Sequence, residues 1–171
     1  MNSSAAGPPS HPPQRGHDDD RDVLEAVSQT LDRVRLLLRK HATRRETLIA
    51  TADPALAQSV RAVLAMHGHQ AFWVTGGVEA AATAACRRFD LILLDLDAPQ
   101  QCLAGARRIR ALPEPFGQAP IAAFVSRLDP TLEDEAIEAG LDAFLPKPLA
   151  PERLVKIATL LIGVTREADA E

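Results

Sequence analysis

The sequence contains no long apolar run. A membrane-spanning helix needs about 18 to 20 consecutive apolar residues, and none of the 171 residues belongs to such a stretch. Residues 1–20 also have no apolar segment of the kind that an export signal requires. We therefore expect a cytoplasmic protein without a membrane partner.

The sequence also has few cysteines and no excess of positive charge. Cys86 and Cys102 are the only cysteines, and they lack the CxxC spacing of a metal or redox site, so an ordinary packing role is predicted for both. Nineteen Lys and Arg residues stand against 23 Asp and Glu residues, for a net charge of -4. This balance produces no general field that would attract nucleic acid, so a partner must recognise a local patch.

Two segments precede the main part of the chain. Residues 1–21 are rich in proline and end in an acidic run without apolar periodicity, so a disordered tail is predicted. Residues 22–45 are predicted to form an amphipathic helix, because apolar residues recur at steps of three and four: Leu24, Val27, Leu31, Val34 and Leu38. Two roles remain open for this stripe, a homodimer through residues 24–38 or packing on the neighbouring domain.

Residues 46–163 alternate between strand and helix patterns five times. The predicted strands are residues 47–51, 71–74, 91–94, 121–125 and 143–145, and a helix is predicted over residues 103–112. Asp53-Pro54 and Asp129-Pro130 each combine an N-cap residue with a proline at the first helical position. Strands separated by helices indicate right-handed crossovers and a doubly wound α/β domain with a parallel sheet. The last helix is predicted to end at Gly163, which leaves residues 164–171 as a C-terminal tail too short for an output domain.

The residues that directly follow the strands are the candidates for function. In a doubly wound sheet, the reactive crevice lies outside the carboxyl ends of the strands. The side chains at these positions are Thr51, Ala52, Asp53, Asp95, Asp97, Val125, Ser126 and Lys147.

Three segments, LILLDLDAP, FVSRLDP and EAGLDAFLPKP, together with the order of elements, resemble the CheY-like receiver domain of bacterial response regulators. The resemblance implies a flavodoxin-like, five-stranded parallel sheet in the order 2-1-3-4-5. It also implies that Asp95 is the phosphoacceptor and that Lys147, 52 residues later, pairs with the phosphoryl oxygens. Phe144 matches the aromatic position that reports the phosphorylation state.

The sequence departs from the family pattern at three places, one of which is the loop after Asp95, where residues 98–103 replace the usual methionine, proline and glycine. Thr51 and Ala52 stand where the family has an acidic pair, so Mg²⁺ binding is predicted to be weakened. The oxygen ligands that remain are Asp95, the backbone carbonyl of Asp97 and, in second place to helix capping, Asp53. The hydroxyl position after the fourth strand is occupied by Val125, with Ser126 next to it.

Three functional hypotheses follow. The first is a receiver in a phosphorelay, not itself an enzyme, that takes a phosphoryl group on Asp95 from a histidine kinase or phosphotransfer protein. The second is a degenerate receiver that binds partners regardless of phosphorylation. A more distant third rests on Asp95-Leu96-Asp97, which resembles the first motif of haloacid-dehalogenase-type phosphohydrolases, although Pro99 and the lack of a later acidic cluster depart from that motif.

Overall fold

The computed structural model describes residues 24–34 and 45–168, with side chains for 24–34 and 45–163. Residues 24–34 form a helix that belongs to a unit separate from the sheet domain. Leu24, Val27, Leu31 and Val34 are all exposed on this helix. The remainder of the predicted helix 22–45 up to residue 44, including Leu38, and the predicted tail 1–21 lie outside the described residues. Within the described ranges, no helix has both the length and the apolar character that crossing a bilayer requires.

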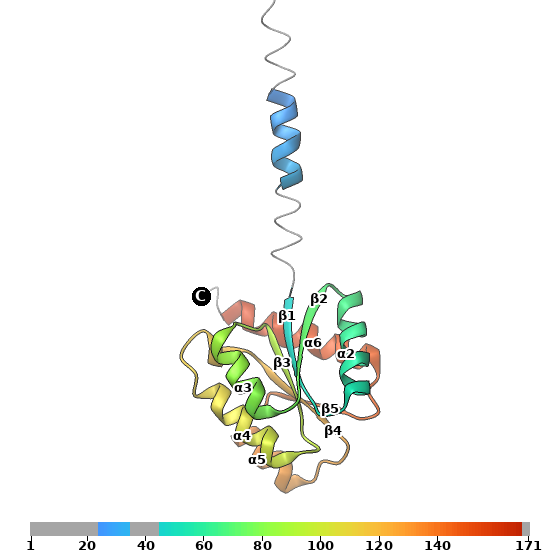
Figure 1. The fold of residues 1–171 in the computed structure, drawn as a ribbon, viewed down its shortest axis with the longest axis vertical. Helices are drawn as coiled ribbons and strands as arrows, with labels where there is room; N and C mark the ends of the chain where they lie inside the picture. Colours follow the sequence, from blue (N-terminus) through green and yellow to red (C-terminus); the bar gives the residue numbers. More distant parts are fainter. Residues whose placement is uncertain (1–23, 35–44, 169–171) are drawn as a thin grey trace, which may run out of the picture. The chain divides into compact units, whose positions relative to one another are not determined.

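Strands and helices alternate along residues 45–168 (Figure 1). The strands are β1 (Arg45–Ala50), β2 (His69–Val74), β3 (Leu91–Asp95), β4 (Ile121–Val125) and β5 (Ala143–Pro146). The helices are α2 (Pro54–Met66), α3 (Gly77–Cys86), α4 (Pro99–Arg110), α5 (Pro130–Glu138) and α6 (Pro151–Ala168), and a short 3-10 turn spans Phe116–Gln118.

The five strands form one parallel sheet in the order β2-β1-β3-β4-β5. This confirms the doubly wound fold and the strand order implied by the family resemblance. The strand order reverses between β1 and β3. The connections that leave these two strands therefore go to opposite faces of the sheet, and a crevice remains at its carboxyl edge. Register places Ala50 beside Leu94, and Asp95 beside Phe124.

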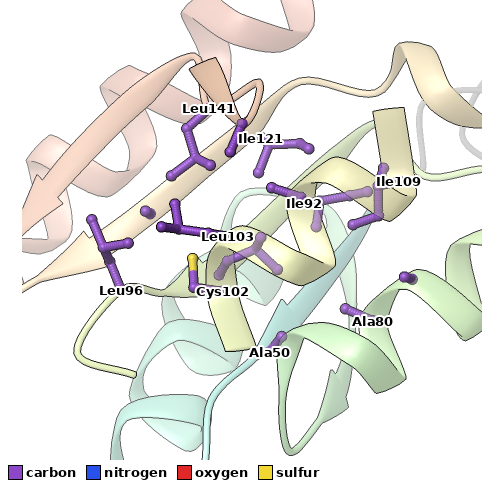
Figure 2. Close-up of a cluster of buried hydrophobic side chains, with 14 of the residues drawn as sticks. Ala50, Ala80, Ile92, Leu96, Cys102, Leu103, Ile109, Ile121 and Leu141 are labelled. Atoms are coloured by element: carbon purple, nitrogen blue, oxygen red, sulfur yellow. The ribbon is translucent and has the colours of Figure 1, made fainter. Parts of the chain in front are cut away.

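Helices cover both faces of the sheet, so β3 and β4 are apolar almost throughout. Helices α3, α4 and α5 pack on one face, where Ala50, Ile92, Leu96, Leu103 and Ile121 belong to a single buried cluster (Figure 2). Helices α2 and α6 pack on the other face through a second cluster that contains Ile49, Val60, Leu93, Phe124 and Leu154. The two cores hold the carboxyl ends of the strands rigidly beneath the candidate site.

The contact between α3 and α4 is unusually close because a glycine lies on each side. A Cβ atom built on Gly105 in α4 would overlap the carbonyl group of Gly77 in α3. A Cβ on Gly77 would in turn overlap the carbonyl oxygen of Gln101. The first turn of α3 is therefore pressed against α4 at the rim of the crevice.

Several predicted boundaries differ from the structure. Helix α4 begins at Pro99, earlier than the predicted residue 103, because Pro99 takes the first helical position although Ala98 offers no side-chain cap. Arg45 opens β1 and therefore does not end the predicted helix 22–45. Helix α6 continues to Ala168, so the predicted tail 164–171 begins in helix. A glycine commonly ends a helix by taking a positive φ angle. Among the described glycines only Gly68 and Gly140 have one, and Gly163 does not terminate α6.

Candidate functional site

The carboxylate that ends β3 and the ammonium that follows β5 meet at the carboxyl edge of the sheet. Lys147 Nζ donates a hydrogen bond to Asp95 Oδ1 over 2.9 Å. The convergence predicted from the sequence is therefore present. The two groups border a depression of about 400 Å³, lined by Ala50, Thr51, Ala52, Asp53, Thr75, Gly76, Gly77, Asp95, Asp97, Ala98, Gln101, Cys102 and Lys147.

Thr51 holds the second oxygen of Asp95. The buried Thr51 hydroxyl donates to Asp95 Oδ2 over 2.6 Å and accepts the backbone N–H of Asp53 over 3.1 Å. Because the Thr51 oxygen accepts the Asp53 N–H through a lone pair, the single proton of the Thr51 hydroxyl is free to be donated to the Asp95 carboxylate. The Thr51 carbonyl accepts a bond from Trp73 Nε1 over 2.9 Å, so β2 also helps to position this residue.

Lys147 is shared between two carboxylates. Its ammonium lies 2.9 Å from Asp97 Oδ2 as well as 2.9 Å from Asp95 Oδ1. Burial alone would lower the pKa of Lys147, but hydrogen bonds to Asp95 and Asp97 outweigh it and raise the pKa above its ordinary value. Burial would likewise raise the pKa of Asp97, yet bonds from Ser126 and Lys147 prevail and lower it. Both groups are charged at neutral pH.

Asp97 also ties the loop after β3 to the loop after β4. Its Oδ1 accepts the Ser126 N–H over 2.8 Å, and its Oδ2 accepts the Ser126 hydroxyl over 2.5 Å. The Ser126 hydroxyl thus contacts Asp97 and not Asp95. This tie was not predicted, because nothing in the spacing of the two residues indicates that their side chains reach each other.

The other two predicted switch positions are apolar and lie nearer the core. Val125 is buried at the end of β4. Phe144 in β5 is half-buried and packs against the cluster beneath α3, α4 and α5. Val125 has no hydroxyl to offer a phosphoryl group, as the sequence indicated.

Cys102 borders the depression as a buried thiol. Burial raises the pKa of its thiol to about 12, and the negative charge of Asp95 adds to the effect. A thiol with such a pKa carries almost no thiolate at neutral pH, and the thiolate is the reactive form. This agrees with the packing role predicted for this residue.

The residues at the depression do not fit a Mg²⁺ site well. Asp53 caps α2, where its Oδ1 accepts the N–H groups of Ala55 and Leu56. Thr51 and Ala52 supply no carboxylate, and both oxygens of Asp95 already accept hydrogen bonds. In the part of the chain that the structure describes, no three His, Cys, Asp or Glu side chains gather closely enough to hold a metal ion.

Comparison with known proteins identifies the family. Residues 47–159 match the model of the response regulator receiver domain, and the chain belongs to this family. Among its relatives is the response regulator MprA of Mycobacterium bovis, with 31% identity over 123 residues that cover 72% of this chain and 53% of the relative. MprA of Mycobacterium avium is 32% identical over 125 residues, which cover 72% and 54%. The chain therefore spans about half the length of these relatives.

Solved structures agree. The receiver domain of a sensor histidine kinase from Pseudomonas aeruginosa, which has a magnesium ion coordinated in its active-site cleft, is 27% identical, with a TM-score of 0.64 over 71% of this chain and 99% of that one. A CheY-like receiver from Methanospirillum hungatei matches in fold, with a TM-score of 0.67, 19% identity, and coverage of 74% and 99%. Residues 47–159 thus form a receiver domain of the kind found in two-component signalling. This finding favours the resemblance to receivers over the resemblance to phosphohydrolases.

Proposed function

We propose that Asp95 accepts a phosphoryl group and that Lys147 supplies the counter-charge for it. The observation that carries this proposal is the 2.9 Å contact between Lys147 Nζ and Asp95 Oδ1 at the edge of an accessible depression. A compact ammonium beside the nucleophilic oxygen is what a transferring phosphoryl group needs, because catalysis of this transfer is mainly positioning and charge stabilisation.

The expected chemistry is a direct displacement. Asp95 Oδ1 gives up the hydrogen bond from Lys147 and forms a bond to phosphorus, while the bond between phosphorus and the leaving group of the donor breaks and the leaving group departs with the electron pair. With acetyl phosphate, acetate leaves and no proton has to be moved. Oδ1 is the oxygen beside Lys147, whereas Oδ2 is held by Thr51, so the new phosphoryl oxygens lie within reach of the ammonium.

The donor in the cell is proposed to be a histidine kinase or a phosphotransfer protein, and the output is proposed to be contact with another protein. Phosphorylation would draw Lys147 toward the phosphoryl oxygens and away from Asp97. Because Asp97 also holds Ser126, this shift alters the loop that leads from β4 into α5. Phe144 in the neighbouring strand is the side chain expected to report the change.

Phosphorylation is tested by incubating the full chain with acetyl phosphate and measuring the intact mass. We expect a gain of one phosphoryl group that is absent in Asp95→Asn, because the amide is a poor nucleophile. Asp134→Asn is the matched control: it is exposed on α5 and does not line the depression, so it should retain the gain. An equal gain in Asp95→Asn would contradict the proposal.

The second candidate is a receiver that binds its partner regardless of phosphorylation. It is favoured by the missing carboxylates at Thr51 and Ala52 and by the apolar Val125, since each of these positions normally assists phosphoryl transfer in the family. If wild-type protein gains no phosphoryl group from acetyl phosphate, this function replaces the first one.

A homodimer through residues 24–38 is also proposed. Leu24 is 69% exposed and Leu31 is 51% exposed on one stripe of helix 24–34, and a second copy would cover this apolar surface. We expect the double variant Val27→Asp and Leu31→Asp to convert the dimer of the full chain into a monomer, so that the mass measured in solution is halved. The reason is that the two substitutions place charge in the middle of the apolar stripe. Substitution of the exposed Gln29, which lies on the opposite side of the helix, by Asp is the control. A wild-type mass equal to that of one chain would contradict the dimer.

A further inference from the structure

The hydrogen bonds around Asp95 leave little room for a divalent cation. Asp95 Oδ2 accepts the Thr51 hydroxyl over 2.6 Å, while Oδ1 accepts both Lys147 Nζ over 2.9 Å and the Asp97 N–H over 3.1 Å. These donors belong to residues that follow three different strands, β1, β3 and β5. They occupy three of the roughly four lone-pair sites of the carboxylate, so a cation that needs more than one of these sites must displace a donor.

The local charge points the same way. Mg²⁺ requires near-octahedral oxygen coordination and loses its water reluctantly, so it depends on one or two well-placed carboxylates in addition to other ligands. The ammonium of Lys147 already lies 2.9 Å from Asp95 and 2.9 Å from Asp97, and it would repel a cation bound between them. Neither Thr51 nor Ala52 adds the negative charge that would offset this repulsion.

We propose that Thr51 and Lys147 together take the place of a divalent cation at this site, and that the site does not bind Mg²⁺ in the millimolar range. The Thr51 hydroxyl holds the oxygen of Asp95 that faces away from Lys147, and Lys147 supplies the positive charge. This distinguishes the chain from the receiver of Pseudomonas aeruginosa, whose active-site cleft coordinates magnesium. The inference concerns the site before any phosphoryl transfer, so it does not depend on whether Asp95 is phosphorylated.

The chain carries its own probe for this test. Trp73 is the only tryptophan, and its indole nitrogen donates to the Thr51 carbonyl over 2.9 Å. A cation bound beside Thr51 would change the surroundings of the indole and raise the melting temperature by mass action. The measurement is Trp73 fluorescence and melting temperature during titration with MgCl₂, compared with NaCl at equal ionic strength. For the wild type we expect no saturable difference between the two salts.

Restoring the carboxylates should restore binding. In Thr51→Asp combined with Ala52→Asp, we expect a saturable Mg²⁺ response, with a dissociation constant at least about tenfold lower than any wild-type value. The double variant should also melt lower than the wild type without Mg²⁺, because it adds two negative charges near Asp95, and should recover as Mg²⁺ is added. The control, Thr51→Asn with Ala52→Asn, has the same shape without the charge and should not respond.

Two results would overturn the proposal. One is a saturable millimolar response in the wild type that disappears in Asp95→Asn. The other is a folded aspartate double variant that gains no response, since the missing carboxylates would then not be the cause. If the double variant does not fold, Ala52→Asp alone serves in its place because Ala52 is exposed. No phosphoryl donor is present in these titrations, so their outcome is separate from that of the phosphorylation assay.

Discussion

Replacing Lys147 by methionine is expected to slow phosphorylation of Asp95 by roughly 100-fold or more. Methionine keeps much of the length of the side chain but removes the ammonium that lies 2.9 Å from Asp95 Oδ1. The charge that develops on the phosphoryl oxygens would then have no cation beside it. The proposed weakness of metal binding makes the effect larger, because no second positive charge is available to compensate. The measurement is the initial rate of phosphoryl gain from acetyl phosphate, followed by intact mass.

Lys156→Met is the matched control for this experiment. Lys156 is exposed on α6 and does not line the depression, so the same loss of charge there should leave the rate unchanged. Equal rates in wild type and Lys147→Met would mean that Lys147 only ties Asp95 to Asp97 and takes no part in the transfer. Circular dichroism and melting curves of both variants separate a loss of folding from a loss of rate.

Gly105→Ala is expected to lower the stability of the domain markedly. The new methyl group would overlap the carbonyl of Gly77, and because that neighbour is backbone, α3 and α4 must move apart. Overpacking of this kind costs about 1–3 kcal/mol in the free energy of unfolding. The strain falls on the first turn of α3, next to Gly76 and Gly77 at the rim of the depression. Urea unfolding of the variant and the wild type measures the cost.

Gly163→Ala is the control for this experiment. It measures the intrinsic preference of a helix for alanine over glycine without the steric overlap. Gly163 also lies in a helix, but a Cβ there would meet nothing within 4 Å. Its replacement should therefore raise the free energy of unfolding, by up to about 1 kcal/mol. If Gly105→Ala is as stable as Gly163→Ala, the close contact between α3 and α4 does not limit stability.

The sequence predicted the strands and the parallel sheet well because the signals were local and strong, whereas the strand order came from the resemblance to the receiver family. Apolar strands such as residues 91–94 need cover on both faces, and the Asp-Pro pairs at 53–54 and 129–130 mark helix starts that the structure confirms. The start of α4 was placed too late because Ala98 offers no capping side chain. The end of α6 was placed too early because a glycine terminates a helix only where the backbone turns left-handed, which Gly163 does not do.

The candidate site was predictable in part. The carboxyl ends of parallel strands meet at one edge, so the sequence alone was enough to bring Asp95 and Lys147 together. Sequence patterns do not show where a side chain reaches across a loop. For this reason the bonds from Ser126 to Asp97 and from Trp73 to Thr51 emerge only from the structure. Thr51 was predicted as a lost metal ligand, and its second role as a donor to Asp95 was missed.

The most direct test of the central claim is the intact mass of the wild-type chain after incubation with acetyl phosphate, once with MgCl₂ and once with EDTA. If Asp95 reacts beside Lys147 without the help of a divalent cation, one phosphoryl group is gained at the same rate in both. A gain that requires MgCl₂ would contradict the proposal that Thr51 and Lys147 replace the cation. No gain in either condition would contradict phosphorylation itself.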